Sequence, residues 1–192
     1  MWEQILPGLR IKIFMTVVLG IAYPLLMTGI CQVAFPYQAN GSLIARNGQL
    51  VGSEILAQGF SKPQYFQPRP SAAGNGYDPT SSGGSNYGPT SQKLYDRMKA
   101  AIDKFHNDNP DFHGPVPSDL LTTSESGLDP DLSPASAEAQ VPRVAKARGA
   151  SADQVRTLVA RFTRGPDLGL LGEPRVNVLR LNLALDRQFP SR

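Results

Sequence analysis

An uncharged segment near the N-terminus constrains this chain more than any other feature. No charged residue occurs from Ile13 to Ala45, and Ile13–Phe35 is apolar at almost every position. Those 23 residues make about 35 Å of α-helix, enough to cross a hydrocarbon core about 30 Å thick. The run exceeds the core of a cleaved signal peptide, which is the alternative, and Val33–Pro36 is a poor cleavage site. The sequence predicts a retained transmembrane helix, Ile13–Phe35.

Charges on the two sides of this segment predict its orientation. Arg10 and Lys12 stand directly before it, and the next charged residue is Arg46. The positive-inside rule keeps such an N-terminus in the cytoplasm and exports the chain that follows. We therefore expect residues 1–12 to be cytoplasmic and residues 36–192 to form one extracytoplasmic domain.

One face of the predicted helix carries residues typical of helix packing in membranes. Gly20, Pro24 and Thr28 recur at a spacing of four and so share a face. Small residues let a second helix approach closely, and a threonine hydroxyl can bond across the contact. These residues are predicted to pack on a partner helix; the alternative is a plain anchor.

The rest of the chain has the size of one domain. Its charges are of both signs, and the net charge of the whole chain is only +3, which does not fit nucleic-acid binding. The single cysteine, Cys31, lies in the apolar segment, so the exported part has no disulfide and no cysteine metal site. We expect His106 and His113 to be solvated, and no metal site is predicted.

Local patterns predict a mixed α+β fold. Ser42–Phe60 has the pattern of two strands around a type I′ turn at Asn47-Gly48, Ser91–Asn107 has helical spacing, and Val116–Thr123 is expected to be a short strand. Gly59–Pro89 is a long loop tract that aromatic residues should attach to the domain. These residues are Tyr65, Phe66, Tyr77 and Tyr87.

The C-terminal third predicts helices. Ser133-Pro134 should open a helix that Pro142 ends, and a second helix should run from Pro142 to Gly149. Ser151 and Gln154 form a capping box that starts another helix. Val176–Leu185 alternates like a strand but contains residues that prefer helix, so both readings stay open and helix is favoured.

No common catalytic motif is present. The chain has neither a P-loop nor a G-x-S-x-G elbow. Ser81–Asn86 could present backbone N–H groups to an anion, but a tight turn is the favoured reading. Asp129 and Asp131 could bind a cation weakly, or Asp131 could lie at the start of the helix opened by Ser133, which is favoured.

Several motifs in the same order resemble the C subunit of the bacterial potassium-transporting Kdp P-type ATPase. They are Arg69–Ala72, Ser82–Asn86 with Gly88-Pro89, Ser124–Pro130, Gln140–Ala145, Ala147–Gly149, Leu171–Leu179 and Asn182–Asp186. The N-terminal anchor is similar too. The chain departs from the family pattern in having Asp131 where a histidine is expected and Glu125 in place of a small residue.

The resemblance implies a non-catalytic subunit of an ATP-driven potassium uptake pump in the bacterial inner membrane. Its partners would be a potassium-translocating subunit, an ATP-hydrolysing subunit and a small single-helix subunit. The family is described as a catalytic chaperone that raises the ATP affinity of the hydrolysing subunit, so ATP is the only cofactor implied. The resemblance assigns partner or nucleotide contacts to Arg69, Ser71, Ser82, Gly83, Gly84, Ser85, Asn86, Ser126, Asp129, Gln140 and Arg143.

Two alternatives remain beside this reading. Arg10 and Lys12 place Ser82–Asn86 outside the cytoplasm, away from ATP, so a cap on the outer mouth of the potassium subunit fits the topology better than a nucleotide site. The second alternative is a membrane-anchored extracytoplasmic hydrolase that uses Ser85 or Ser126 with Asp129.

Overall fold

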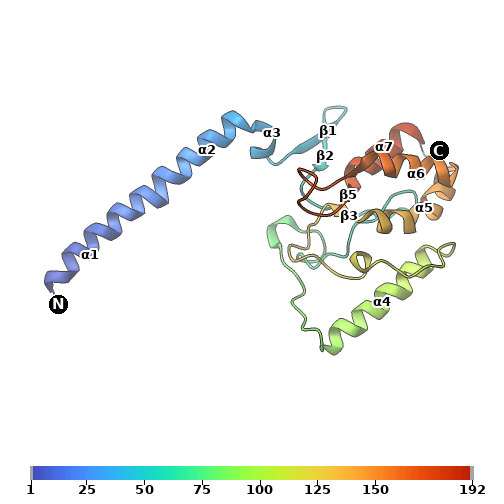
Figure 1. Ribbon diagram of the computed structural model, residues 1–192, viewed down its shortest axis with the longest axis horizontal. Helices are drawn as coiled ribbons and strands as arrows, with labels where there is room; N and C mark the ends of the chain where they lie inside the picture. Colours follow the sequence, from blue (N-terminus) through green and yellow to red (C-terminus); the bar gives the residue numbers. More distant parts are fainter. Residues whose placement is uncertain (1, 191–192) are drawn as a thin grey trace. The chain divides into compact units, whose positions relative to one another are not determined.

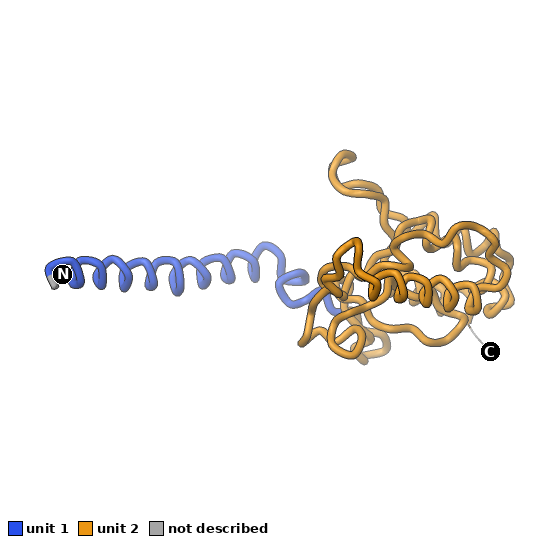
Figure 2. Tube along the Cα trace, turned by 90° about the horizontal axis from the view of Figure 1, so that it is seen from below, with its two compact units in different colours: residues 1–43 blue, residues 44–192 orange. Residues whose placement is uncertain are grey.

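The computed structural model describes residues 2–190 and divides into two compact units, residues 1–43 and 44–192 (Figures 1 and 2). The first unit is one long helix and a short turn of helix. Its parts are α1 (Trp2–Met15), a π-helical stretch (Thr16–Ala22), α2 (Tyr23–Ala34) and α3 (Pro36–Ala39). The second unit contains all the other helices and strands described below.

The helix Glu3–Ala34 is long and apolar enough to cross a membrane, and the chain buries none of its most apolar window. Gly20 lies in the π-helical stretch, whereas Pro24 and Thr28 lie in α2. A π-helix has wider turns than an α-helix, so the register between Gly20 and the other two differs from that of the α-helix on which their shared face was predicted. All three residues are exposed within this unit.

A small hairpin opens the second unit. β1 (Leu43–Arg46) pairs with β2 (Gln49–Ser53). Asn47 and Gly48 both have positive φ, 53° and 77°, which a type I′ turn requires. The predicted hairpin is confirmed, but the second strand ends at Ser53, well before Phe60.

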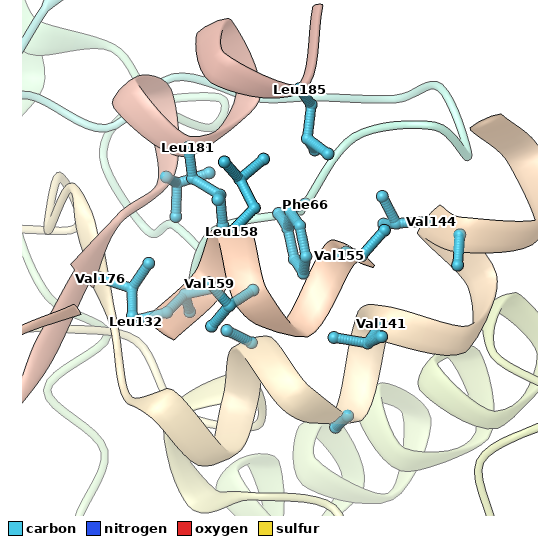
Figure 3. Packing of buried hydrophobic residues seen from close by; sticks show 14 of the residues in the cluster. Phe66, Leu132, Val141, Val144, Val155, Leu158, Val159, Val176, Leu181 and Leu185 are labelled. Atoms are coloured by element: carbon cyan, nitrogen blue, oxygen red, sulfur yellow. The ribbon is translucent and has the colours of Figure 1, made fainter. Parts of the chain in front are cut away.

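Three helices and a three-stranded sheet enclose the main core (Figure 3). The helices are α5 (Pro134–Arg148), α6 (Ala152–Phe162) and α7 (Val178–Gln188). The antiparallel sheet has the order β3 (Asp131–Leu132), β5 (Arg175–Asn177), β4 (Thr163–Arg164). Phe66, from the loop tract, is fully buried among side chains of these helices.

Capping side chains define the ends of these helices as predicted. The Ser133 hydroxyl accepts a hydrogen bond from the Ser136 N–H, and Ser151 and Gln154 form both bonds of a capping box. Gly149 ends α5 with φ 63°. The predicted break at Pro142 is wrong, because α5 runs through it as one helix that buries Val141 and Val144. Packing on both sides of the proline therefore outweighs the lost backbone bond.

Two more assignments need correction. Val116–Thr123 forms no strand; Ser118–Leu120 is a 3-10 turn whose Leu120 is buried. Val176–Leu185 divides into both predicted alternatives: β5 ends at Asn177, whose side chain caps α7 by accepting a bond from Arg180 N–H. The long helix α4 (Gln92–Asp108) is confirmed, but among its residues only Phe105 is buried, and it keeps 9% of its area exposed. A 3-10 turn at Pro79–Ser81 completes the described elements.

Candidate functional site

Three loop segments that are far apart in the sequence form one surface of the second unit. We call residues 69–72, 82–86 and 124–129 together the three-loop surface. The Ser71 hydroxyl donates to the Gly127 carbonyl at 2.6 Å, and Gly83 N–H donates to the Ser126 carbonyl at 2.9 Å. Arg69 forms a 2.8 Å ion pair with Asp129. Most of the residues assigned by resemblance therefore lie together.

Glycines allow the three segments to approach this closely. Gly127 has φ 67°, and a Cβ added there would lie 2.7 Å from both Ala73 N and Gly83 O. A Cβ on Gly84 would lie 3.0 Å from the Glu125 carbonyl oxygen. Any side chain at Gly127 would push the segments apart, so packing alone explains why this position is a glycine, without reference to any ligand.

The tight turn favoured for Ser81–Asn86 is not what the structure contains. Ser81 ends the 3-10 turn Pro79–Ser81, and residues 82–86 have no turn or helix assignment and bond to residues 123–126. The Ser82 hydroxyl donates to the Ser126 carbonyl at 2.9 Å, and Ser85 accepts from the Thr123 hydroxyl at 3.3 Å. The serine hydroxyls that were expected to close a local turn therefore bond to a segment about forty positions away in the sequence.

A shallow concavity of about 630 Å³ lies on the three-loop surface. Its lining combines serine hydroxyls, the carboxylates of Glu125 and Asp129, and the apolar side chains of Ile55 and Leu128, and it includes no lysine or arginine. A phosphate ligand needs positive charge or several free N–H groups, and this lining contains neither a cation nor a helix N-terminus.

Neither serine that was considered as a nucleophile has a catalytic partner in residues 2–190. The Ser126 hydroxyl is within 3.3 Å of Ser124 Oγ and accepts a bond from Leu128 N–H. Asp129 is engaged by Arg69 and by the Asp131 N–H. Both histidines, His106 and His113, are exposed as predicted and contribute nothing to this surface.

Gln140 and Arg143 lie away from the three-loop surface, buried under the loop tract. The Gln140 amide pairs with both backbone groups of Gln67, at 2.8 and 3.1 Å. Arg143 donates to the Pro63 and Tyr65 carbonyls and to two side-chain amides. Burial lowers the pKa of Arg143 to about 10. Their polar groups are used inside the unit, which gives both residues a structural role.

Asn182 and Arg148, which no functional assignment included, hold the same tract. Asn182 pairs with both backbone groups of Phe66 at 2.9 Å. Arg148 has no exposed side-chain area, donates to the Gln64 carbonyl, and forms a 2.9 Å ion pair with Asp186. The only available signal was their place in the motifs, because nothing in their spacing indicates which loop they bind.

The position of Asp131 differs from the favoured prediction. It lies in β3, bonded to Asn177 and 3.4 Å from Arg175, while Asp119 occupies the start of α5 and accepts bonds from Ser133 and Ser136. Burial, opposed in part by the Asn177 hydrogen bond and reinforced by the nearby Asp129 charge, raises the pKa of Asp131. No cluster of three potential metal ligands occurs among the described residues.

The structure defines a class: a mixed α/β domain that follows one apolar N-terminal helix and presents a polar surface of tightly bonded loops. Comparison with known proteins agrees with this class. The family model described as "K+-transporting ATPase, c chain" matches residues 5–187. Curated relatives called potassium-transporting ATPase KdpC subunit include one from Koribacter versatilis strain Ellin345, 52% identical over 99% of this chain and 97% of its own length.

Two further relatives with the same description are equally informative. The protein from Rhodospirillum rubrum is 52% identical over 99% of this chain and 98% of its own length. The protein from Myxococcus xanthus is 51% identical over 98% of this chain and 90% of its own length. This chain therefore belongs to the KdpC family of potassium-transporting ATPase subunits, as its motifs indicated.

Proposed function

We propose that this chain is a non-catalytic accessory subunit whose second unit acts outside the cytoplasm and stabilises the potassium pump. The observation that carries the proposal is the charge asymmetry around the apolar helix: Arg10 and Lys12 precede it, and no charge follows before Arg46. With family membership, this asymmetry favours an exported domain that contacts the potassium-translocating subunit from outside.

The three-loop surface is the partner contact in this proposal. Its segments are cross-linked by short hydrogen bonds and by the Arg69–Asp129 ion pair. A surface that is already ordered loses little conformational entropy when it binds, so even a polar contact can give useful affinity. The proposed role is a rigid cap on the outer mouth of the potassium pathway.

Any effect on the ATP affinity of the hydrolysing subunit is proposed to act through the assembly and not through nucleotide contacts of this chain. The lining of the surface concavity supports this proposal, since Glu125 would repel phosphate groups and Asp129, which is paired with Arg69, leaves no net positive charge there. The chain purified alone should neither hydrolyse ATP nor bind it. Binding of ATP to the isolated chain, with loss on Ser82→Ala, would contradict this part of the proposal.

Reporter fusions test the orientation. A C-terminal alkaline phosphatase fusion should be active and a green fluorescent protein fusion dark, because the first folds only outside and the second only inside. The reverse pattern would overturn the extracytoplasmic role. Copurification of the tagged wild-type chain with other pump subunits from mild detergent tests subunit membership separately.

Paired substitutions test the surface. Asp129→Ala should lower copurification or potassium-dependent ATPase activity while the second unit still unfolds at nearly its normal temperature. The matched control is Arg156→Ala, which breaks an exposed ion pair with Glu138 on the helices. Normal assembly in both variants would remove the three-loop surface from the interface, and loss of folding in Asp129→Ala would make the residue structural.

A second pair of substitutions tests whether the apolar helix packs on a partner helix. Gly20→Leu should weaken assembly, because the larger side chain keeps two helix backbones apart, whereas Gly29→Leu should have a smaller effect. Both glycines have open space for a side chain within the first unit; a Cβ added at Gly20 would lie 3.7 Å from the Thr16 methyl carbon, an ordinary van der Waals distance. Equal and negligible losses would mean that the helix is only an anchor.

A further inference from the structure

The loop between β4 and β5 exposes leucine side chains to an unusual degree. Leu168 is 91% exposed, Leu170 88% and Leu171 63%, which are among the highest values of any large apolar residue in the second unit. We call residues 165–174 the leucine loop; in Figure 1 it is the dark orange-red segment that leads into β5. An apolar patch on a domain surface is a recognised mark of an interaction site.

The leucine loop is held in shape by its own backbone. Asp167 and Leu171 exchange two hydrogen bonds, of 2.8 and 2.9 Å. Leu168 has φ 55°, a left-handed conformation that is unfavourable for leucine. The Asp167 carboxylate is held by Arg175 at 3.1 Å. The three leucines are therefore presented by an ordered loop, although none of them packs into the core.

Charge argues against a lipid surface as the occupant. Residues 165–174 carry two carboxylates, Asp167 and Glu173, and no lysine or arginine. The flanking cations are already paired, Arg164 with Glu54 and Arg175 with Asp167. Loops and helices that insert at membrane surfaces combine apolar residues with free cations or with tryptophan and tyrosine, and this loop has neither.

Area and charge argue against a second copy of the chain. Three leucines expose on the order of 400 Å² of apolar surface, half of the roughly 800 Å² per partner that a stable complex buries. The Glu173 carboxylates of two such loops would also repel each other across a symmetric contact. The patch is large enough only as one contact among several in a larger assembly.

We propose that the leucine loop docks into an apolar groove with a basic rim on another subunit of the same pump. The inference rests on the proposed function, since it needs an assembly that other contacts already hold. The basic rim follows from the Glu173 carboxylate, which adjoins the leucines in the loop and forms no ion pair among the described residues, whereas Asp167 is already paired with Arg175. The loop is a contact separate from the three-loop surface.

Substitution in the full-length chain tests the proposal. Leu168→Asn combined with Leu170→Asn should lower recovery of the other subunits about tenfold or more, because burying even one leucine is worth about a tenfold change in affinity. Asparagine suits the left-handed conformation at residue 168, so the double variant should unfold at the wild-type temperature or above. The control is Leu50→Asn, at a 63% exposed leucine of β2, with recovery near wild type.

Cross-linking identifies the occupant. The variant Leu170→Cys is made in a Cys31→Ser background. In the assembled pump, its thiol is labelled with a maleimide that also carries a photoreactive group, which forms the cross-link on illumination. An adduct with another subunit supports the proposal; an adduct with a second copy, with lipid alone, or with nothing overturns it. Wild-type recovery of the double variant, or an equal loss with Leu50→Asn, also overturns it. Failure of the wild-type chain itself to copurify would instead refute the proposed function.

Discussion

Two irregular segments of the second unit, residues 63–67 and the leucine loop, differ in what holds them. The first lies between α5 and α7, and side-chain amides replace the neighbouring strand it lacks: Asn182 bonds both backbone groups of Phe66, and Gln140 bonds both of Gln67. The leucine loop bonds mainly to itself. One segment buries its large apolar residue completely, and the other exposes three.

The difference teaches that order and burial are separate properties of a loop. Residues 63–67 are ordered because the buried polar side chains Arg143 and Arg148 also donate to their carbonyls. Unpaired backbone groups in the core would be costly, so the helices must supply these partners. The leucine loop needs no such partners because its backbone polar groups face each other or solvent, and its side chains stay available for a partner.

Of the substitutions that test how residues 63–67 and the leucine loop are held, Asn182→Leu should lower stability most. Asn182→Leu leaves the buried Phe66 N–H and carbonyl without partners, and we expect a loss of about 4 kcal/mol in the free energy of unfolding. Thermal unfolding followed by circular dichroism should shift down by roughly 10 °C. The control is Asn107→Leu, at an exposed position near the end of α4. A shift no larger than the control's would mean that packing of Phe66 alone holds the segment.

Gly127→Ala should cause the next largest loss in the free energy of unfolding. The new Cβ meets backbone atoms of Ala73 and Gly83 at 2.7 Å and also imposes the left-handed penalty, so we expect a loss of about 2–3 kcal/mol. Gly149→Ala is the matched control, because that glycine has nearly the same φ, 63°, with open space around it. Its cost should be about 1 kcal/mol. Equal costs in urea unfolding would show that the three-loop surface can spread to accept a side chain.

Sequence reasoning succeeded where the signal was local. The Asn47-Gly48 turn, the Ser151 capping box and the Gly149 helix end are set by conformational preferences within a few residues. It failed at Pro142 and at Val116–Thr123, where tertiary packing decides the conformation. Local preference contributes about 1 kcal/mol per signal, and the packing of a helix in a core exceeds that.

The sequence predicted most of the residues of the candidate site but not how they contact one another. The family motifs named Arg69, Ser82 and Ser126 as partner or nucleotide contacts, and the structure brings them to one surface. Their separation in the sequence does not indicate that they meet. The same motifs also could not distinguish these surface residues from Gln140, which is buried in the core. Exposure of Leu168 was likewise invisible, since an apolar residue in a sequence is usually expected inside.

Leu168→Asn alone should have a small effect of the opposite sign on folding. We expect the free energy of unfolding to rise by about 0.5 kcal/mol, because asparagine tolerates φ 55° better than leucine and no core contact is lost. Leu170→Asn should change it by less. A loss above 1 kcal/mol in either variant would show that the leucines stabilise the unit itself, and the contrast between the two segments would no longer hold.

Asp131→Asn should have the smallest effect, seen through its pH dependence. Asp131, in β3, bonds Asn177 and faces Arg175, which also pairs with Asp167, so Arg175 links this strand residue to the leucine loop. Its pKa is raised, mainly by burial, so the folded unit binds this proton more tightly than the unfolded chain does. The ionised carboxylate therefore lowers stability once the pH rises above the ordinary value of 3.8 and through the raised pKa. The variant lacks this cost, and its urea midpoint should gain on wild type as the pH rises from about 4 through the raised pKa of Asp131. A gain by wild type over that range would mean that the ion pair with Arg175 outweighs burial, so that the base of the leucine loop is held by charge and not by its backbone alone.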